Sequence, residues 1–225
     1  MTTMADSQID LFSSYPEWTA FLAHEHGFQE EAHHREIATR LDLVCRGEIE
    51  RLMILMPPGA QMSTYVSHWF PAWYLRHGNV HNSVQIAART LLSEQHSRLA
   101  QEIAVKYAGA PPPRQLGFWD LGAAAACHHR GMDGIFLGLR ADLALIEQPY
   151  NSYLEAQSAA FRDAVYAWYR EVLCCRLLPG ARIVLAMSRH HEDDLSGHLL
   201  REEHGQWSVL TIPESALAHY GLSAT

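Results

Sequence analysis

The sequence is poor in lysine and has no segment suited to crossing a membrane. Lys106 is the only lysine among 17 basic side chains. A run of roughly eighteen uncharged apolar residues, which a membrane-spanning helix needs, does not occur. The N-terminal stretch MTTMADSQID lacks the basic and then apolar order of a secretory signal. These absences predict a cytosolic protein.

Cysteine is also scarce, and its spacing excludes the common metal and redox motifs. The four cysteines, at positions 45, 127, 174 and 175, show no CxxC spacing, so we expect small, buried, apolar residues with reduced thiols. The runs 127–129 (Cys-His-His) and 190–193 (His-His-Glu-Asp) do not favour zinc. Adjacent side chains point to opposite faces of a strand and diverge around a helix, so neither run gives three converging ligands.

Length and composition predict one sizeable hydrophobic core. The chain has 225 residues, of which 48% are hydrophobic. No internal repeat is present, which excludes a solenoid. The net charge of -8 disfavours a surface that coats nucleic acid. Any contact with DNA must therefore be local or supplied by a partner.

Hydrophobic periodicity predicts alternating strands and helices. Apolar segments expected as strands lie at 51–56, 83–88, 141–149, 181–187 and 207–212. Helices are expected within 15–46, where Gly47 would cap the second of two, and at about 90–107, 153–177 and 192–204. An exposed break is expected at 108–115, and one or two strands within the glycine-rich stretch 118–140. This alternation predicts an α/β fold with a mainly parallel sheet and helices on both faces.

The stretch RLMILMPPGAQMSTYVS, residues 51–67, is typical of a phosphate-binding loop: a strand, a glycine turn and a helix that opens on hydroxyl residues. Pro71 should kink or break that helix. Backbone N–H groups and the helix N-terminus would hold the anion, and Gly59 allows close approach. However, Met62 stands where such a loop wants lysine, which should impair hydrolysis more than nucleotide occupancy. An ordinary turn with a helix cap would show the same pattern.

Four ordered blocks between about residues 15 and 212 resemble the ATPase domain of phage terminase large subunits, the motors that pump DNA into proheads. The first two are YPEWTAFLAHEHGF and HHREIATRLDLVCRGEIERLMILMPPGAQMSTYVSHWFPAWYL. The third, ADLALIEQP, is similar to an acidic strand that usually reads IDDP. The fourth, WYREVLCCRLLPGARIVLAMSRHHEDDLSGHLL, is similar to a block that usually ends in MTRWHEDDL.

The resemblance implies a RecA-like P-loop NTPase fold. An N-terminal helical subregion is expected at 1–48 and an ATPase-like core at 49–225, without a counterpart of the nuclease domain that usually follows in the family. The implied cofactors are ATP and Mg²⁺. The implied partners are double-stranded DNA, the portal and the small terminase subunit, with a homo-oligomeric ring and no membrane. Such a phage or prophage protein would act in the cytoplasm of a bacterial host cell.

The resemblance also assigns the cofactor-binding and acidic positions. The residues expected to hold the phosphates are Pro58, Gly59, Ala60, Gln61, Met62, Ser63 and Thr64. Ser63 and Glu147 would bind Mg²⁺. The next family carboxylate, which polarises the attacking water, maps onto Gln148, whose amide cannot accept a proton. General-base help is typically about 10²–10⁴-fold in rate, so its loss predicts very slow hydrolysis. The alternatives are that Glu147 doubles as the base, or that the register slips by one.

Further site residues follow the later strands. Ser188 and Arg189 match the family segment that senses the γ-phosphate. The sequence HEDDL at 191–195 is intact, although a helix start with acids near the dipole explains it equally well. Arg89 and Arg98 follow the second strand, whose C-terminal end should lie beside the loop. We hypothesise that one of them replaces the missing lysine at the phosphates; a surface or structural role is the alternative.

Two roles are possible for the histidines near the site and for the aromatic residues. His33 and His34 match a family pair near the adenine side of the site, but exposed histidines on a helix would look the same. The aromatic residues Trp69, Trp73, Tyr74, Trp168 and Tyr169 could stack on bases, and we expect core positions instead.

Two functions therefore follow from the sequence. The first is the ATP-binding domain of a viral DNA-packaging motor with impaired hydrolysis. The second is a catalytically inactive prophage remnant or binding module that keeps the fold.

Overall fold

The computed structural model describes residues 8–78, 82–87, 89–112, 115–122 and 125–215. The strands are β1 Arg51–Leu55, β2 Asn82–Ala87, β3 Phe118–Asp120, β4 Ala126–Gly131, β5 Ala141–Glu147, β6 Leu177–Met187 and β7 Ser208–Thr211. Parts of several predicted segments lie outside the described residues: 1–7 of the helical subregion, 88 of the second strand, 113–114 of the break, 123–124 of the glycine-rich stretch and 216–225 of the core.

The helices alternate with these strands along the chain. They are η1 Gln8–Leu11, α1 Tyr15–Glu25, α2 Ala32–Arg46, η2 Thr64–Trp69, α3 Phe70–His77, α4 Thr90–Tyr107, α5 Tyr153–Gln157, α6 Ala159–Trp168, η3 Tyr169–Leu173, η4 Cys174–Arg176 and α7 Leu195–Glu202. Gly47 ends α2 with φ 81°, the left-handed conformation that glycine adopts without steric cost, so the predicted cap is confirmed.

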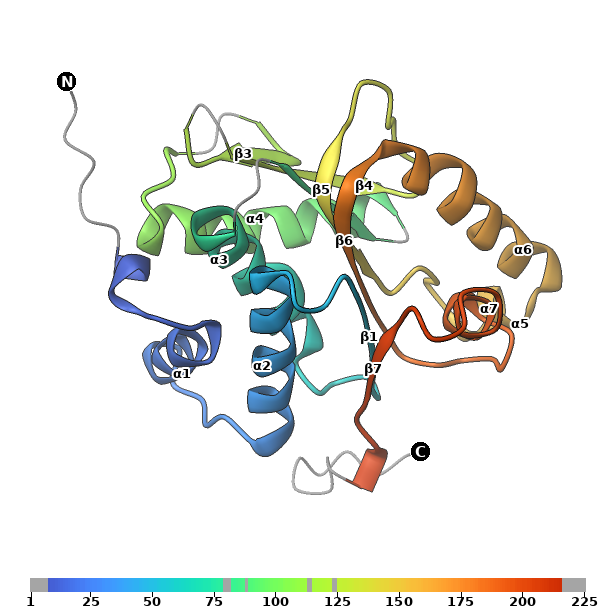
Figure 1. Ribbon diagram of the computed structural model, residues 1–225, viewed down its shortest axis with the longest axis horizontal. Coiled ribbons are helices and arrows are strands. Elements are labelled where there is room, and N and C mark those ends of the chain that lie inside the picture. The colour runs from blue at the N-terminus through green and yellow to red at the C-terminus, as the bar shows by residue number, and fades with distance from the viewer. Residues whose placement is uncertain (1–7, 79–81, 88, 113–114, 123–124, 216–225) are drawn as a thin grey trace.

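The described strands form a seven-stranded sheet in the order β3-β4-β2-β5-β6-β1-β7 (Figure 1). β3 pairs with β4 in antiparallel fashion, and the pairings among the other strands are parallel. The predicted α/β class with a mainly parallel sheet is therefore confirmed.

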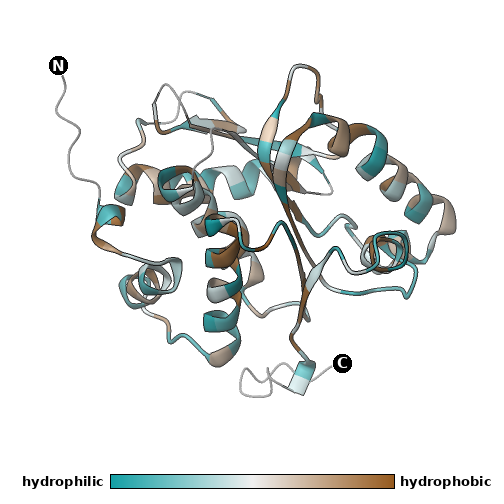
Figure 2. Cartoon of the chain, in the orientation of Figure 1, coloured by the Kyte–Doolittle hydropathy of each residue, from teal (hydrophilic) through white to brown (hydrophobic). Residues whose placement is uncertain are grey.

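Helices cover both faces of the sheet because its central strands are apolar on both sides. In β1, Leu52 and Ile54 pack into the cluster formed with α1, α2, η2, α3 and α4. Met53 and Leu55 pack into the other cluster, with α5, α6, η3 and α7. This alternation follows from the period of two along a strand. Figure 2 shows the hydrophobic strands between helices whose outer sides are hydrophilic.

The helix expected after the loop divides next to Pro71. The π-helix η2, in which the Phe70 N–H donates to the Tyr65 carbonyl five residues back, is followed by α3, and Pro71 lies in the first turn of α3. Two other local predictions were wrong. The helix predicted at 153–177 divides at Ser158, whose side chain caps α6. The strand predicted from 181 begins at Leu177 and runs through the Pro179–Gly180 turn. Among the described residues, no helix is long and apolar enough to cross a membrane.

The central position of β6 gives a test of this core. Leu185 is fully buried near the C-terminal end of β6, whereas Leu154 is 78% exposed. Leu185→Ala should lower the free energy of unfolding by about 2–5 kcal/mol, since it removes transfer energy and leaves a cavity. Leu154→Ala, the same chemical change at the surface, should lower it by less than about 0.5 kcal/mol. Urea unfolding followed by circular dichroism measures both; equal losses would contradict this assignment of the core.

Candidate functional site

The candidate site lies where neighbouring parallel strands end. β1 pairs with β6 and β6 with β5, so their C-terminal ends meet at one edge of the sheet. The loop of residues 56–62 follows β1, Glu147 ends β5, and Ser188 follows β6. Ligands of parallel α/β sheets bind at this edge, because the loops there leave a crevice. The fold therefore brings together the three sequence blocks that were expected to form one site.

The loop after β1 adopts a strained turn. Gly59 has φ 86°, and Gln61 has φ 56°, which a residue with a Cβ rarely adopts. Thr64 N–H donates to the Gln61 carbonyl at 3.1 Å and closes the turn into the helix. Left-handed non-glycine residues cost on the order of 1–3 kcal/mol and concentrate at functional sites. Gln61 is therefore an indication of function that the sequence pattern did not give.

Met62 packs inward from this loop. Its side chain is 6% exposed and belongs to the same apolar cluster as Ala60 and Val66. A neutral side chain therefore fills the position at which the resemblance expects lysine, and it contributes to the core. Its packing explains how the loop keeps its shape without a cation.

Glu147 is the centre of the polar contacts at this edge. Its carboxylate is 2% exposed and accepts hydrogen bonds from the hydroxyls of Ser63 and Ser67. Ser63 comes from the start of the helix after the loop, and Ser67 lies four residues later on the same helical face. The predicted pair Ser63 and Glu147 is thus in direct contact, and Ser67 joins it.

The donor set at Ser63 and Glu147 fits Mg²⁺. Mg²⁺ prefers oxygen ligands and is usually held by one or two protein groups together with phosphate oxygens and water. A hydroxyl and a carboxylate at the end of a phosphate-type loop supply such a set. Among the described residues, no group of three or more His, Cys, Asp or Glu side chains converges on a metal position.

Gln148 is held by the neighbouring strand end. Its side-chain nitrogen donates to the Ser188 hydroxyl at 3.2 Å, and its side-chain oxygen accepts from the Ser188 N–H at 3.2 Å. Gln148 has φ 44°, so two left-handed glutamines flank the site. The Gln148 amide, at the position expected to polarise water, is thus bonded to Ser188, which was expected to sense the γ-phosphate. Both the nitrogen and the oxygen of the amide have a partner.

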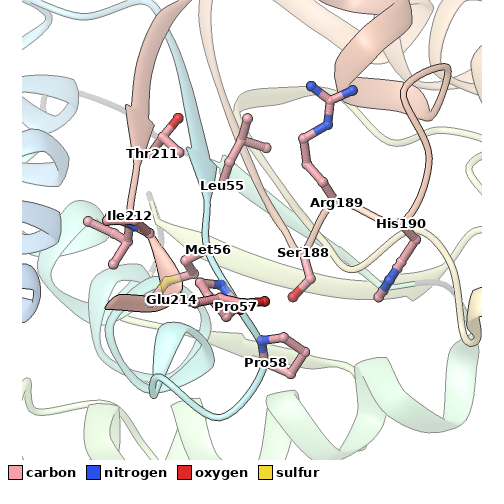
Figure 3. A pocket seen from close by; sticks show the side chains of 11 residues that line it. Leu55, Met56, Pro57, Pro58, Ser188, Arg189, His190, Thr211, Ile212 and Glu214 are labelled. Atoms are coloured by element: carbon pink, nitrogen blue, oxygen red, sulfur yellow. The ribbon is translucent and has the colours of Figure 1, made fainter. Parts of the chain in front are cut away.

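A pocket of about 420 Å³ opens beside the loop. Pro57 and Pro58 line it from the end of β1, and Ser188, Arg189 and His190 line it from the end of β6. In Figure 3 the Ser188 hydroxyl points toward the prolines, whereas the Arg189 side chain extends the other way.

Arg189 already has partners of its own chain. Its guanidinium donates to the carbonyls of His191 and Glu192, at 3.3 and 2.8 Å, and lies 3.7 Å from the Asp194 carboxylate. It is the one arginine among the described residues that line this pocket. An anion entering the pocket would compete for the guanidinium with those partners.

The two other candidate arginines have different surroundings. Arg89 forms an ion pair with Glu155 at 3.3 Å. Arg98 is exposed on α4, two positions from the buried His96 and so on a different face of that helix. Across the described part of the chain, no hydrogen bond or ion pair joins either side chain to the loop.

His34 is buried against the loop. It is fully buried, as is most of His33, so exposed histidines are not what the structure shows. The His34 ring stacks on Tyr65, and its Nδ1 accepts from the Glu31 N–H at 3.1 Å. Burial, followed by the neighbouring His33, lowers the pKa of His34 to about 4, and an interaction with the Ala60 backbone partly opposes this shift.

The HEDDL stretch builds a helix start. Asp194 is fully buried, accepts from the Gly197 N–H at 3.1 Å and from the Ser196 hydroxyl at 2.5 Å, and caps α7. Asp193 pairs with Arg201. The structural interpretation of these acids as helix-start residues is therefore confirmed.

Sequence reasoning missed three side chains at Glu147's site. Ser67 donates to Glu147, His96 Nε2 lies 3.7 Å from its carboxylate, and His68 contacts His96. The spacing of Ser63 and Ser67 by one helical turn was the available signal for Ser67. Nothing in the sequence links α4 to β5.

The core interpretation of the aromatic residues holds for four of the five, which are at most 3% exposed: Trp69, Trp73, Tyr74 and Tyr169. Trp168 is half-buried.

These features define an α/β protein whose parallel sheet brings a glycine loop, a hydroxyl-bearing helix and a buried acidic residue to one edge. No protein-family model matches the chain, and no curated protein matches it significantly.

The buried His34 predicts a pH dependence of stability. Its pKa is lowered from about 6.5 to about 4 in the folded protein, so the unfolded chain binds the proton more readily between these values. The contribution of neutral His34 to the free energy of unfolding is therefore complete above about pH 6.5, and it is lost as the pH falls to about 4. Urea titrations across this range should show a shallower decline for His34→Gln than for the parent. The exposed His24 provides the control, and His24→Gln should leave the slope unchanged.

The cap at α7 predicts a second stability effect. Asp194→Ala removes the acceptor for Gly197 and Ser196 and leaves Arg189 without its carboxylate. Loss of a helix cap costs about 0.5–2 kcal/mol, and we expect the upper end because the group is buried. Thermal unfolding measures the loss of stability for both variants. Asp193→Ala, which changes the partly exposed acid next to Asp194, should lose less stability than Asp194→Ala. A larger loss for Asp193→Ala would contradict the capping role.

Proposed function

We propose that the chain is an ATP-binding domain of the terminase large-subunit type, from a viral DNA-packaging motor, in which hydrolysis is impaired. The contact of the Ser63 hydroxyl with the Glu147 carboxylate carries this proposal. It places a loop hydroxyl and an acidic strand end where a Mg²⁺ ion bound to nucleotide phosphates would need them. Double-stranded DNA, the portal and the small terminase subunit as partners, and a ring assembly, rest on the sequence resemblance.

The mainly parallel sheet is compatible with a RecA-like fold, and equally with a Rossmann-like one. β6 lies between β1, which leads into the loop, and β5, which ends in the acidic residue. The loop then faces Glu147 and Ser188 across the edge of the sheet.

The roles of the described residues follow from this placement. Backbone N–H groups of the loop and the start of the helix at Met62 would hold the phosphates. Ser63 and Glu147 would hold Mg²⁺, which supplies charge neutralisation at the phosphate oxygens when bound. Ser188, whose hydroxyl points into the pocket, would meet the terminal phosphate. Arg189 could reach it only by leaving its carbonyl partners.

Hydrolysis lacks two of its expected groups. Met62 is packed in the core, so no ammonium group faces the phosphates. Gln148 is bonded to Ser188 through both of its amide atoms and cannot take a proton from water. Binding requires less from this site than turnover does, because donors aimed at the developing charge matter most in the transition state.

The same two observations favour the second candidate, a binding module or inactive prophage remnant that keeps the fold. Met62 and Gln148 are both well accommodated, one in the core and one between two strand ends. Failure of the folded parent protein to bind ATP separates this candidate from a motor domain with impaired hydrolysis.

ATP hydrolysis by the purified chain beside a Met62→Lys, Gln148→Asp double variant tests the proposal. We expect negligible turnover in the parent and a gain of about 10²-fold or more in the variant, because a cation and a second carboxylate return. Met62→Leu, Gln148→Glu is a matched control in which residue 62 stays neutral, so its gain should be smaller. Isothermal titration with ATP and Mg²⁺ measures binding separately.

Two results would count against it. Brisk hydrolysis by the parent would show that another group supplies the missing functions. Failure of the parent to bind ATP with Mg²⁺, while thermal unfolding confirms a folded protein, would leave the inactive remnant as the better description. Because Met62 is buried, the melting temperature of each variant must be measured together with its rate. A lysine whose ammonium group stays buried at position 62 will lower that temperature.

A further inference from the structure

The two oxygens of Glu147 have different surroundings. Oε1 accepts from Ser63, at the start of the helix after the loop. Oε2 accepts from Ser67, one turn further from the loop, and lies 3.7 Å from His96 Nε2 on α4. One oxygen thus faces the loop, and the other faces a group of side chains behind it.

His96 is fixed from its other side by His68. The distance from His68 Nε2 to His96 Nδ1 is 3.0 Å, and the two rings lie 5.2 Å apart. Burial, followed by the neighbouring His96, lowers the pKa of His68 to about 3, so His68 is neutral at neutral pH. If His68 donates its Nε2 proton to His96 Nδ1, His96 presents an N–H at Nε2, toward Glu147.

The surroundings leave little freedom to this group. His96 is 7% exposed on α4, between η2, which carries Ser67 and His68, and the sheet, which carries Glu147 on β5. His129 on β4 is 3% exposed and also lies near. Burial lowers its pKa well below the usual value, and the neighbouring His96 and, more weakly, His68 contribute to this shift. His129 Nε2 accepts from Trp119 at 3.0 Å.

We propose that Ser67 and His96 are positioning residues for Glu147, which hold its Oε2 so that Oε1 stays directed at Ser63 and the Mg²⁺ position. This assignment rests on the proposed nucleotide function, and it adds to the site two side chains from the helices η2 and α4. A buried carboxylate with one oxygen anchored cannot rotate toward solvent, and such outer contacts orient a metal ligand. His68 acts one step further, because it fixes the ring of His96.

The side-chain carboxyl ¹³C resonance of Glu147 tests this without any nucleotide. The protein is labelled at glutamate Cδ, and Glu147→Gln identifies the signal. His96→Leu and Ser67→Ala should each shift the Glu147 resonance, because each removes a neighbour of Oε2. His96→Gln, which can place an amide N–H near the position of Nε2, should return the resonance toward its parental value. That rescue would not occur for a histidine that merely fills space.

Matched controls use the same changes at neighbouring places. Ser97→Ala removes a buried hydroxyl next to His96 on α4, and His128→Leu removes a half-buried ring from β4. Neither should shift the Glu147 resonance. An unchanged resonance in folded His96→Leu and Ser67→Ala would overturn the proposal. If the leucine variant does not fold, His96→Asn, whose shorter amide leaves the Nε2 position empty, is read in the same way.

Calorimetry links the contact to the function. ATP affinity is measured with Mg²⁺ and with excess chelator, for the parent, His96→Leu and His96→Gln. We expect His96→Leu to weaken the Mg²⁺-dependent part by about 10-fold or more, and the chelated measurement to stay the same. Equal weakening in both conditions would indicate a structural role and overturn the proposal. If the parent binds no ATP while the resonance responds as expected, the nucleotide function fails and the positioning contact stands.

Discussion

The buried carboxylate of Glu147 is the interaction on which the candidate site depends. A charged or polar group that is 2% exposed must be hydrogen-bonded, since its desolvation is costly. Two serine hydroxyls from the helix after the loop satisfy it, and they tie the end of β5 to the start of that helix. The loop after β1 is therefore positioned by a contact with a different strand, and its shape does not depend on Met62 alone.

Strained backbone and uncharged side chains occur together at this edge of the sheet. Gln61 and Gln148 both adopt left-handed backbone conformations, Gln61 at the end of the loop after β1 and Gln148 directly after β5. Such strain persists only where the surroundings determine the conformation, and here Ser188 bonds the Gln148 amide while the core holds Met62. The proposed anion site at this edge would therefore depend on backbone N–H groups, because Arg189 and Arg89 are bonded to groups of their own chain.

The three candidate arginines show that position in the sequence does not by itself make a residue part of a site. All three follow strands that end at the edge of the sheet where the candidate site lies. Arg189 lines the pocket but bonds to carbonyls of its own loop, Arg89 pairs with Glu155, and Arg98 is exposed on α4. Sequence position placed each within reach in principle. For Arg189 and Arg89, nearby carbonyls and acids hold the side chain, because a guanidinium group has five donors to satisfy.

The sequence by itself determined the alternation of strands and helices, the strand ends at which Ser63, Glu147 and Ser188 meet, and the helix start at Asp194. Apolar runs and helix caps are local signals, and parallel pairing then brings the strand ends together. Only the tertiary structure decided that Met62 packs inward, that His34 is buried against Ala60, and that His96 from α4 reaches Glu147. Such contacts join residues far apart in the chain, so neither spacing nor periodicity encodes them.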